Sequence, residues 1–144
     1  MDIKIFIDKE RAEEIHIYAH ERTPLIEEIE RLVAENNLEL IGYTDSEAIK
    51  INPINVNCFI SEGNKVFALT DDRLQIRLRL YQLDDLLDNN FIKINQSCIA
   101  NIRQIKKVQA TFSGAISVIF NNGYEDYISR RNLKSVTEML GVKL

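Results

Sequence analysis

Apolar and polar residues alternate in short runs over most of this chain, which is the pattern of β-strands with one buried face. The runs cover residues 38–43, 48–51, 56–60, 65–70, 74–78, 91–94, 105–112, 116–120 and 124–128. Hairpin turns are predicted where Asp71-Asp72, Ser113-Gly114 and Asn121-Asn122-Gly123 separate two such runs. The pattern therefore predicts a mainly β chain.

Two further alternating runs stand at the start of the chain, at residues 3–7 and 14–20. A helix follows them, for which Thr23 is the predicted N-cap and Pro24 the first residue. Its apolar stripe consists of Leu25, Ile29, Leu32 and Val33, and Asn36-Asn37 ends it. Residues 1–44 are thus expected to form a small β-β-α unit, and residues 45–144 a separate strand-dominated domain.

Two more helices are predicted inside the strand-dominated domain. Residues 80–87 place four leucines at helical spacing. Ser129 is a candidate N-cap for the last helix, whose apolar residues are Leu133, Val136, Met139 and Leu140 and whose stop is Gly141. The predicted fold class is therefore α+β overall, with short helices added to antiparallel β-sheets.

Composition adds the broad class of protein. Hydrophobic residues make up 45% of the 144 residues and charged residues 28%, which is ordinary for a soluble globular protein. No apolar run is long enough to cross a bilayer, and residues 1–8 lack a basic leader and a cleavage site. We therefore expect a cytoplasmic protein with no membrane contact.

Cys58 and Cys98 lie in apolar, strand-like surroundings and are expected to be reduced, buried thiols.

The net charge of −4 is unevenly distributed along the chain. Residues 1–56 contain six Lys/Arg and thirteen Asp/Glu, a charge of −7, whereas residues 57–144 carry +3. From residue 91 onward, eight basic residues face three acidic ones, a charge of +5. Such asymmetry indicates an acidic module beside an end that binds a polyanion.

Two polar segments interrupt the alternation in this basic part. Residues 95–97 read Asn-Gln-Ser, and residues 129–132 read Ser-Arg-Arg-Asn. Amides, hydroxyls and guanidinium groups hydrogen-bond phosphates and base edges. Neither segment holds a nucleophile beside a base, so the available chemistry is recognition and no enzyme activity is expected.

Elsewhere in the chain, few residues are placed to form a metal site or an acid–base pair. His16 and His20 share one face of a predicted strand, but four strand residues span about 13 Å, too far for one metal ion. The pairs Asp71-Asp72 and Asp84-Asp85 are adjacent in sequence, so their carboxylates are poorly placed to face each other as an acid–base dyad. We expect neither a metal site nor a cofactor.

Residues 49–140 resemble the LytTR family, the β-rich DNA-binding domain of bacterial response regulators. The residues that carry the resemblance are the loop at 60–66, the leucine-rich segment 83–87 with the signature FIKINQSCIAN at 91–101, and Asn122-Gly123 followed by Ile128-Ser129-Arg130-Arg131. These segments occur in the family's order and at compatible spacing. The resemblance implies three loops, mounted on short strands, that enter successive grooves of double-stranded DNA.

By position, the resemblance assigns DNA contacts to Asn64 and Lys65, to Asn95, Gln96 and Ser97, and to Ser129, Arg130, Arg131 and Asn132. Lys93 and Lys134 flank these loops and are expected to contact phosphates. Family members often have an aromatic residue where Lys65 stands. The receiver domain of full-length response regulators has no counterpart in the residues before this domain, so control by aspartyl phosphorylation is not expected.

Each loop also has a purely structural interpretation. Arg130-Arg131 can be two solvated cations, although a helix N-terminus disfavours positive charge unless an anion lies nearby. Residues 95–97 can be a capped turn and residues 63–65 a plain hairpin turn, and in both cases side chains can still project toward DNA. Asn101 lies between Ala100 and Ile102 and is expected to be a buried structural amide.

These observations predict a sequence-specific transcriptional regulator that binds double-stranded DNA. The alternative is a non-catalytic protein-interaction or small-ligand sensor module that uses the acidic residues 1–44. A β-β-α unit of that size buries little core alone, so its apolar residues need a partner. We expect a homodimer formed through this N-terminal region.

Overall fold

A computed structural model describes residues 1–12 and 14–144, apart from the side chains of residues 35–37. The strands are β1 (Leu40–Tyr43), β2 (Ala48–Ile51), β3 (Cys58–Glu62), β4 (Lys65–Leu69), β5 (Arg73–Ile76), β6 (Phe91–Asn95), β7 (Cys98–Asn101), β8 (Ile105–Ala110), β9 (Ile116–Phe120) and β10 (Glu125–Ile128). The helices are α1 (Pro24–Asn37), α2 (Leu80–Leu86) and α3 (Arg130–Leu140), with short 3₁₀ turns η1 (Pro53–Asn55) and η2 (Ile102–Gln104). The prediction of a mainly β, α+β fold is confirmed.

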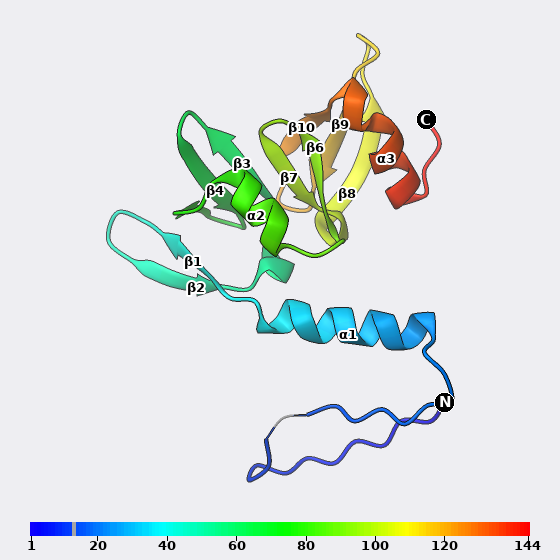
Figure 1. Cartoon of the computed structure of the whole chain (residues 1–144). Helices are drawn as coiled ribbons and strands as arrows, with labels where there is room; N and C mark the ends of the chain where they lie inside the picture. The colour runs from blue at the N-terminus through cyan, green and yellow to red at the C-terminus, as the bar shows by residue number, and fades with distance from the viewer. Residues whose placement is uncertain (13) are drawn as a thin grey trace.

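The strands form two antiparallel sheets (Figure 1). The larger sheet has seven strands in the order β2-β1-β5-β4-β3-β7-β6, and the smaller has three in the order β10-β9-β8. The smaller sheet and α3 lie on one side of the larger sheet, and α2 packs on its other face. The middle of the larger sheet is therefore covered on both faces.

Two apolar clusters fill these two interfaces. The cluster under α2 contains Phe59, Val66, Ala68, Ile99 and Leu83. The cluster under the smaller sheet and α3 contains Cys58, Ile60, Cys98, Ala100, Val118, Phe120 and Val136. Because β3 and β7 contribute side chains to both clusters, they are buried almost throughout. Strands covered on both faces read as continuous apolar runs rather than alternating ones, and β7 was absent from the predicted strands for this reason.

The predicted helix ends are largely confirmed. The Thr23 hydroxyl accepts a hydrogen bond from the Ile26 N–H at 3.4 Å, as an N-cap does. Gly141 ends α3 with φ of 67°, the left-handed conformation that glycine adopts without steric cost. Ser129 occupies the N-cap position of α3, but its side chain makes no cap hydrogen bond.

The N-terminal β-β-α unit is found only in part. Helix α1 is present, whereas the described residues from 1 to 22 are extended and form no strand ladder (Figure 1). Apart from Ile17, all of them are exposed, including Ile3, Phe6 and Ile7 at 82–86%. A strand needs a neighbouring edge for its backbone hydrogen bonds, and a lone two-stranded ribbon is marginal in water. Among the described residues, no strand pairs with this segment.

The expected seam between residues 44 and 45 falls inside a paired hairpin. Strand β1 pairs with β2 along its length and with β5 through Tyr43, so it belongs to the seven-stranded sheet. Helix α1 lies against η1 and buries Ile26. Among the described residues, no helix is long and apolar enough to cross a membrane.

Candidate nucleic-acid interface

Three turns come together at one edge of the molecule. They are the β3–β4 turn at residues 63–64, the β6–β7 turn at residues 96–97, and the junction of β10 with α3 at Ser129. The Ser61 N–H donates to the Ser97 carbonyl at 2.9 Å, and the Ser129 N–H donates to the Ile94 carbonyl at 2.8 Å. These two backbone bonds hold the middle turn against its neighbours, and all three lie along the upper side of Figure 1, away from α1.

The β6–β7 turn is organised by the side chain of Asn95. Its Nδ2 donates to Asp126 Oδ1 at 3.0 Å and to the Tyr127 carbonyl at 2.8 Å, and its Oδ1 accepts from the Ser97 N–H at 2.8 Å. All of its amide donors and one acceptor position are thus used inside the chain. Asn95, a predicted DNA contact, is placed to shape the turn and to tie it to β10.

The next two residues are the ones that the turn presents to solvent. Gln96 and Ser97 are exposed, and their side chains make no hydrogen bond to any described residue. A glutamine amide can pair with both the N6 and N7 positions of adenine. The turn therefore separates a structural amide at position 95 from a free amide at position 96.

The β10–α3 junction presents two cations at the start of a helix. Arg130 and Arg131 are exposed and form no ion pair with the described residues. The first N–H groups of α3 also lack helical partners, as at every helix start. The Asn132 Nδ2 donates to the Ser129 Oγ at 2.8 Å, which occupies the side chain expected to cap the helix. Two positive charges beside the positive end of a helix dipole are mildly unfavourable, and an anion bound there makes the arrangement favourable.

The β3–β4 turn is a tight two-residue hairpin. Gly63 has φ of 59°, the positive value that the first position of a type II′ turn requires. Asn64 and Lys65 follow it, and both are exposed. Lys65 forms no ion pair with the described residues, whereas the adjacent Glu62 is paired with Arg73 across the hairpin. The free cation and amide of this turn therefore face solvent.

The two flanking lysines lie on different sides of the edge. Lys93 precedes the β6–β7 turn, and it pairs with Ile99 on the face of the larger sheet that α2 covers. Lys134 lies on α3, one turn after the junction, and is exposed. Neither lysine forms an ion pair within the described part of the chain. The structure therefore brings Lys134 to the arginine pair and places Lys93 on the opposite face.

A partly buried polar cluster lies beneath the middle turn, and no pattern in the sequence indicates it. The Asp126 carboxylate accepts from Asn95, from the Tyr124 hydroxyl at 3.1 Å and from the Tyr127 N–H at 2.8 Å. A hydrogen bond with Cys58, burial and the nearby Asp126 raise the pKa of the Cys98 thiol. Burial and Asp126 likewise raise the pKa of Tyr124. Thiol and phenol therefore both stay protonated at neutral pH.

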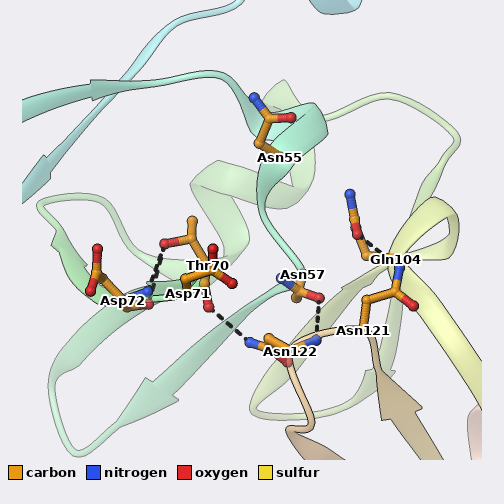
Figure 2. A pocket seen from close by; sticks show the side chains of 8 residues that line it. All are labelled: Asn55, Asn57, Thr70, Asp71, Asp72, Gln104, Asn121 and Asn122. Atoms are coloured by element: carbon orange, nitrogen blue, oxygen red, sulfur yellow. Dashed lines mark hydrogen bonds between the residues drawn. The ribbon is translucent and has the colours of Figure 1, made fainter.

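A polar pocket of about 460 Å³ lies at the opposite end of the strands (Figure 2). Its lining residues are Asn55, Asn57, Thr70, Asp71, Asp72, Gln104, Asn121 and Asn122. Figure 2 shows that several of them bond one another: Asn122 donates through its backbone N–H to Asn57 and through its side chain to the Thr70 carbonyl. These bonds join the β9–β10 turn of the smaller sheet to the larger sheet, so this end of the molecule is a structural joint.

Asn101 is part of the same joint. It is fully buried, and its Nδ2 donates to the Val56 carbonyl at 2.8 Å and to the Ile54 carbonyl at 3.0 Å. Its Oδ1 accepts from the Arg103 N–H at 3.1 Å. The expectation of a buried structural amide is confirmed. Cys58 and Cys98 are buried and free, also as expected.

Comparison with known proteins gives a consistent picture. A family model described as the LytTr DNA-binding domain matches residues 46–141. An uncharacterized HTH-type transcriptional regulator of Staphylococcus aureus strain MSSA476 is 33% identical over 148 residues, covering 99% of each chain, and one from strain NCTC 8325 is 32% identical with the same coverage. A LytTr DNA-binding domain from Bacillus cereus shares the fold, with a TM-score of 0.66, 18% identity, and coverage of 72% of this chain and 97% of that one. In this chain, at least one strand lies between any two consecutive described helices. A helix-turn-helix motif would instead place two helices directly after each other.

Proposed function

This chain belongs to the LytTr DNA-binding domain family and is a DNA-binding transcriptional regulator, and from that premise we propose that its three turns contact double-stranded DNA together. The observation that carries the proposal is the pair of backbone hydrogen bonds that fix the three turns at one edge, with unpaired cations around them. A fixed edge binds with little loss of conformational entropy.

Positioning on the duplex comes from the cations. Arg130, Lys134 and Lys65 neutralise phosphates, and a phosphate at the start of α3 also satisfies the free N–H groups of that helix. Lys93, on the face that α2 covers, adds only to the positive charge near this edge. Recognition of sequence comes from side chains with directional hydrogen bonds. Arg131 reads guanine, and Gln96 reads adenine. Ser97 and Asn64, whose side chains are shorter, make further polar contacts. Ser129 and Asn132 bond each other and hold the junction in shape, as Asn95 holds the middle turn.

Salt dependence is the first test of this proposal. If the three positioning cations, Lys65, Arg130 and Lys134, each neutralise one phosphate, the slope of log K against log salt is about −2.7 per protomer. Fluorescence anisotropy with duplexes selected from a random pool measures this slope, with an unselected duplex for comparison. Absence of duplex binding at low salt by the folded protein would refute the proposal.

Two variants distinguish a residue that reads bases from a residue that positions the protein on the phosphates. Arg131→Ala is expected to weaken the selected site by roughly 1–3 kcal/mol and to relax preference at one or two base pairs. Lys134→Ala is expected to weaken selected and unselected duplexes alike and to make the salt slope shallower by about 1. Lys106→Ala, which removes the same charge from the far end of β8, is the matched control. Equal losses on every duplex for Arg131→Ala would make that residue a phosphate contact.

We further propose that two copies associate through residues 1–33, while the β-rich part that follows binds DNA. More than half of the exposed large apolar side chains in the described residues lie in this segment. They include the alternating Ile3, Ile5 and Ile7 and the helix stripe Leu25, Leu32 and Val33. A second copy supplies the strand edge that a single chain lacks. A twofold dimer presents two sets of turns, and DNA half-sites one or two helical turns apart are then expected.

Association is tested with exposed positions, so that folding is left intact. Leu32→Glu is expected to shift the protein from dimer to monomer in sedimentation at micromolar concentration. Leu86→Glu places the same change on an exposed leucine of α2 and is expected to leave the mass unchanged. A wild-type protein that is monomeric at all concentrations, free and on DNA, would remove the dimer without affecting the three turns.

A further inference from the structure

Phe112 is the most exposed large apolar side chain among the described residues. Its relative exposure is 114%, so it touches almost nothing in its own chain. It lies at the tip of the hairpin between β8 and β9, flanked by Thr111 and Ser113. An aromatic ring in that position contributes nothing to the core and is free to contact a molecule outside the chain.

The tip is a closed turn, in which hydrogen bonds fix the backbone on either side of Phe112. The Thr111 N–H donates to the Ala115 carbonyl at 2.8 Å, and the Gly114 N–H donates to the Thr111 carbonyl at 3.0 Å. The Thr111 hydroxyl also donates to the Ala115 carbonyl at 2.9 Å. Gly114 has φ of 84°, which a residue with a side chain rarely adopts. The backbone that carries Phe112 is therefore already ordered before any contact is made.

Strand register places this tip beside the DNA edge. Ile116 of β9 pairs with Ala110 of β8 on one side and with Ile128 of β10 on the other. Strand β10 ends there and leads directly into Ser129, whereas the β8–β9 hairpin continues for the residues 111–115. The tip thus projects from the same end of the smaller sheet as the arginine pair. Figure 1 shows it extending beyond the start of α3.

The chemistry of the tip suits a groove of DNA. Residues 110–116 contain no charged side chain, so nothing there repels phosphates, and Ser113, Gly114 and Ala115 are small enough for close approach. A protein partner would need a wide apolar patch, because specific interfaces bury roughly 800 Å² on each side. Phe112 has polar neighbours and stands alone. Single apolar side chains on protruding elements are used to wedge between base steps from the minor groove.

We propose that Phe112 is a fourth DNA-contacting element, an aromatic wedge that partly unstacks one base step next to the site bound by the Ser129–Arg131 junction. This inference rests on the proposed function, because it assumes that the same edge faces DNA. It adds a residue outside the three turns and predicts a local distortion of the duplex. Flexible pyrimidine–purine steps are the preferred location, since they unstack at the lowest cost.

The test compares Phe112→Ala with Tyr81→Ala, which removes another exposed aromatic ring from α2 on a different face. Both variants are expected to keep the wild-type urea midpoint, because neither ring is in a core cluster. Phe112→Ala is expected to lose about five- to 150-fold in affinity for the selected duplex, the range for one base–aromatic stack. Tyr81→Ala is expected to bind as the wild type does.

A fluorescent base analogue gives the second readout. The duplex carries 2-aminopurine at one adenine position at a time, and its fluorescence rises where stacking is lost. Wild type is expected to brighten one step, and Phe112→Ala none. Equal affinity of Phe112→Ala and wild type would overturn the wedge and leave the three turns standing. A loss of affinity with no brightened step in the wild-type complex would also overturn it, and would place Phe112 on a thymine methyl or sugar instead. Failure of wild type to bind any duplex would defeat both proposals.

Discussion

Replacing Asn95 with alanine distinguishes a residue that builds the interface from one that reads DNA. The substitution removes three hydrogen bonds, of 3.0, 2.8 and 2.8 Å, that join the β6–β7 turn to β10 and close the turn on itself. Each such bond contributes roughly 0.5–1.5 kcal/mol net, and the one to the Asp126 carboxylate lies at the upper end. Asn95 is half-buried, so water replaces part of the loss, and Asp126 keeps its bonds from Tyr124 and Tyr127. We expect a loss of about 2 kcal/mol in the free energy of unfolding.

Urea denaturation measures this loss. With a slope of about 2 kcal/mol per molar, the midpoint should fall by about 1 M without a change in slope. DNA affinity is expected to fall on every duplex, because Gln96 and Ser97 lose their fixed position. Gln96→Ala, one residue away and exposed, is the matched control: it should keep the urea midpoint and lose preference at one base pair. If Asn95→Ala kept full stability and lost preference at a single base pair, Asn95 would be a reader and the structural assignment would fail.

Two further predictions concern buried groups. Cys58 and Cys98 are buried, and a hydrogen bond and burial raise the pKa of Cys98. Iodoacetamide at neutral pH is therefore expected to label neither thiol until urea unfolds the protein, as measured by mass spectrometry. Rapid labelling of the native protein would contradict this. Asn101→Ala is expected to cost about 3 kcal/mol or more, above the loss for Asn95→Ala, because it leaves the buried Val56 carbonyl without a donor and removes one of the two donors to the Ile54 carbonyl. A smaller loss than that of Asn95→Ala in the same urea series would show that water enters this joint.

Local patterns were sufficient to predict most of the strands and helices. Alternation located the strands that have one buried face, and Pro24 and Gly141 marked helix ends because their backbone preferences act within a few residues. Strand β7 could not be found in this way. Its four residues are all buried because both faces of the larger sheet are covered there, and a short continuous apolar run has no period to detect. Tertiary covering, rather than local preference, determines that element.

The candidate site shows a similar division. The sequence identified the segment Asn95-Gln96-Ser97 but could not assign different roles to its two amides. The roles differ because Asp126 and Tyr127, more than thirty residues later, reach Asn95 and do not reach Gln96. Phe112 was overlooked for a related reason. The alternating run that predicts this strand extends to residue 112, and only the register of β8 with β9 shows that the strand ends at Ala110 and leaves Phe112 exposed.

The N-terminal segment is the place where pattern and fold diverge most, and the divergence is itself informative. Ile3, Ile5 and Ile7 alternate as strand residues do, yet they remain exposed, and no strand among the described residues pairs with them. A hydrophobic alternation that a single chain does not use is consistent with pairing between chains, since exposed apolar strands otherwise favour aggregation. The segment also lies in the acidic part of the chain, which keeps it away from phosphates. Charge and hydrophobicity therefore both support the proposal that the N-terminal segment associates with a second copy while the β-rich part binds DNA.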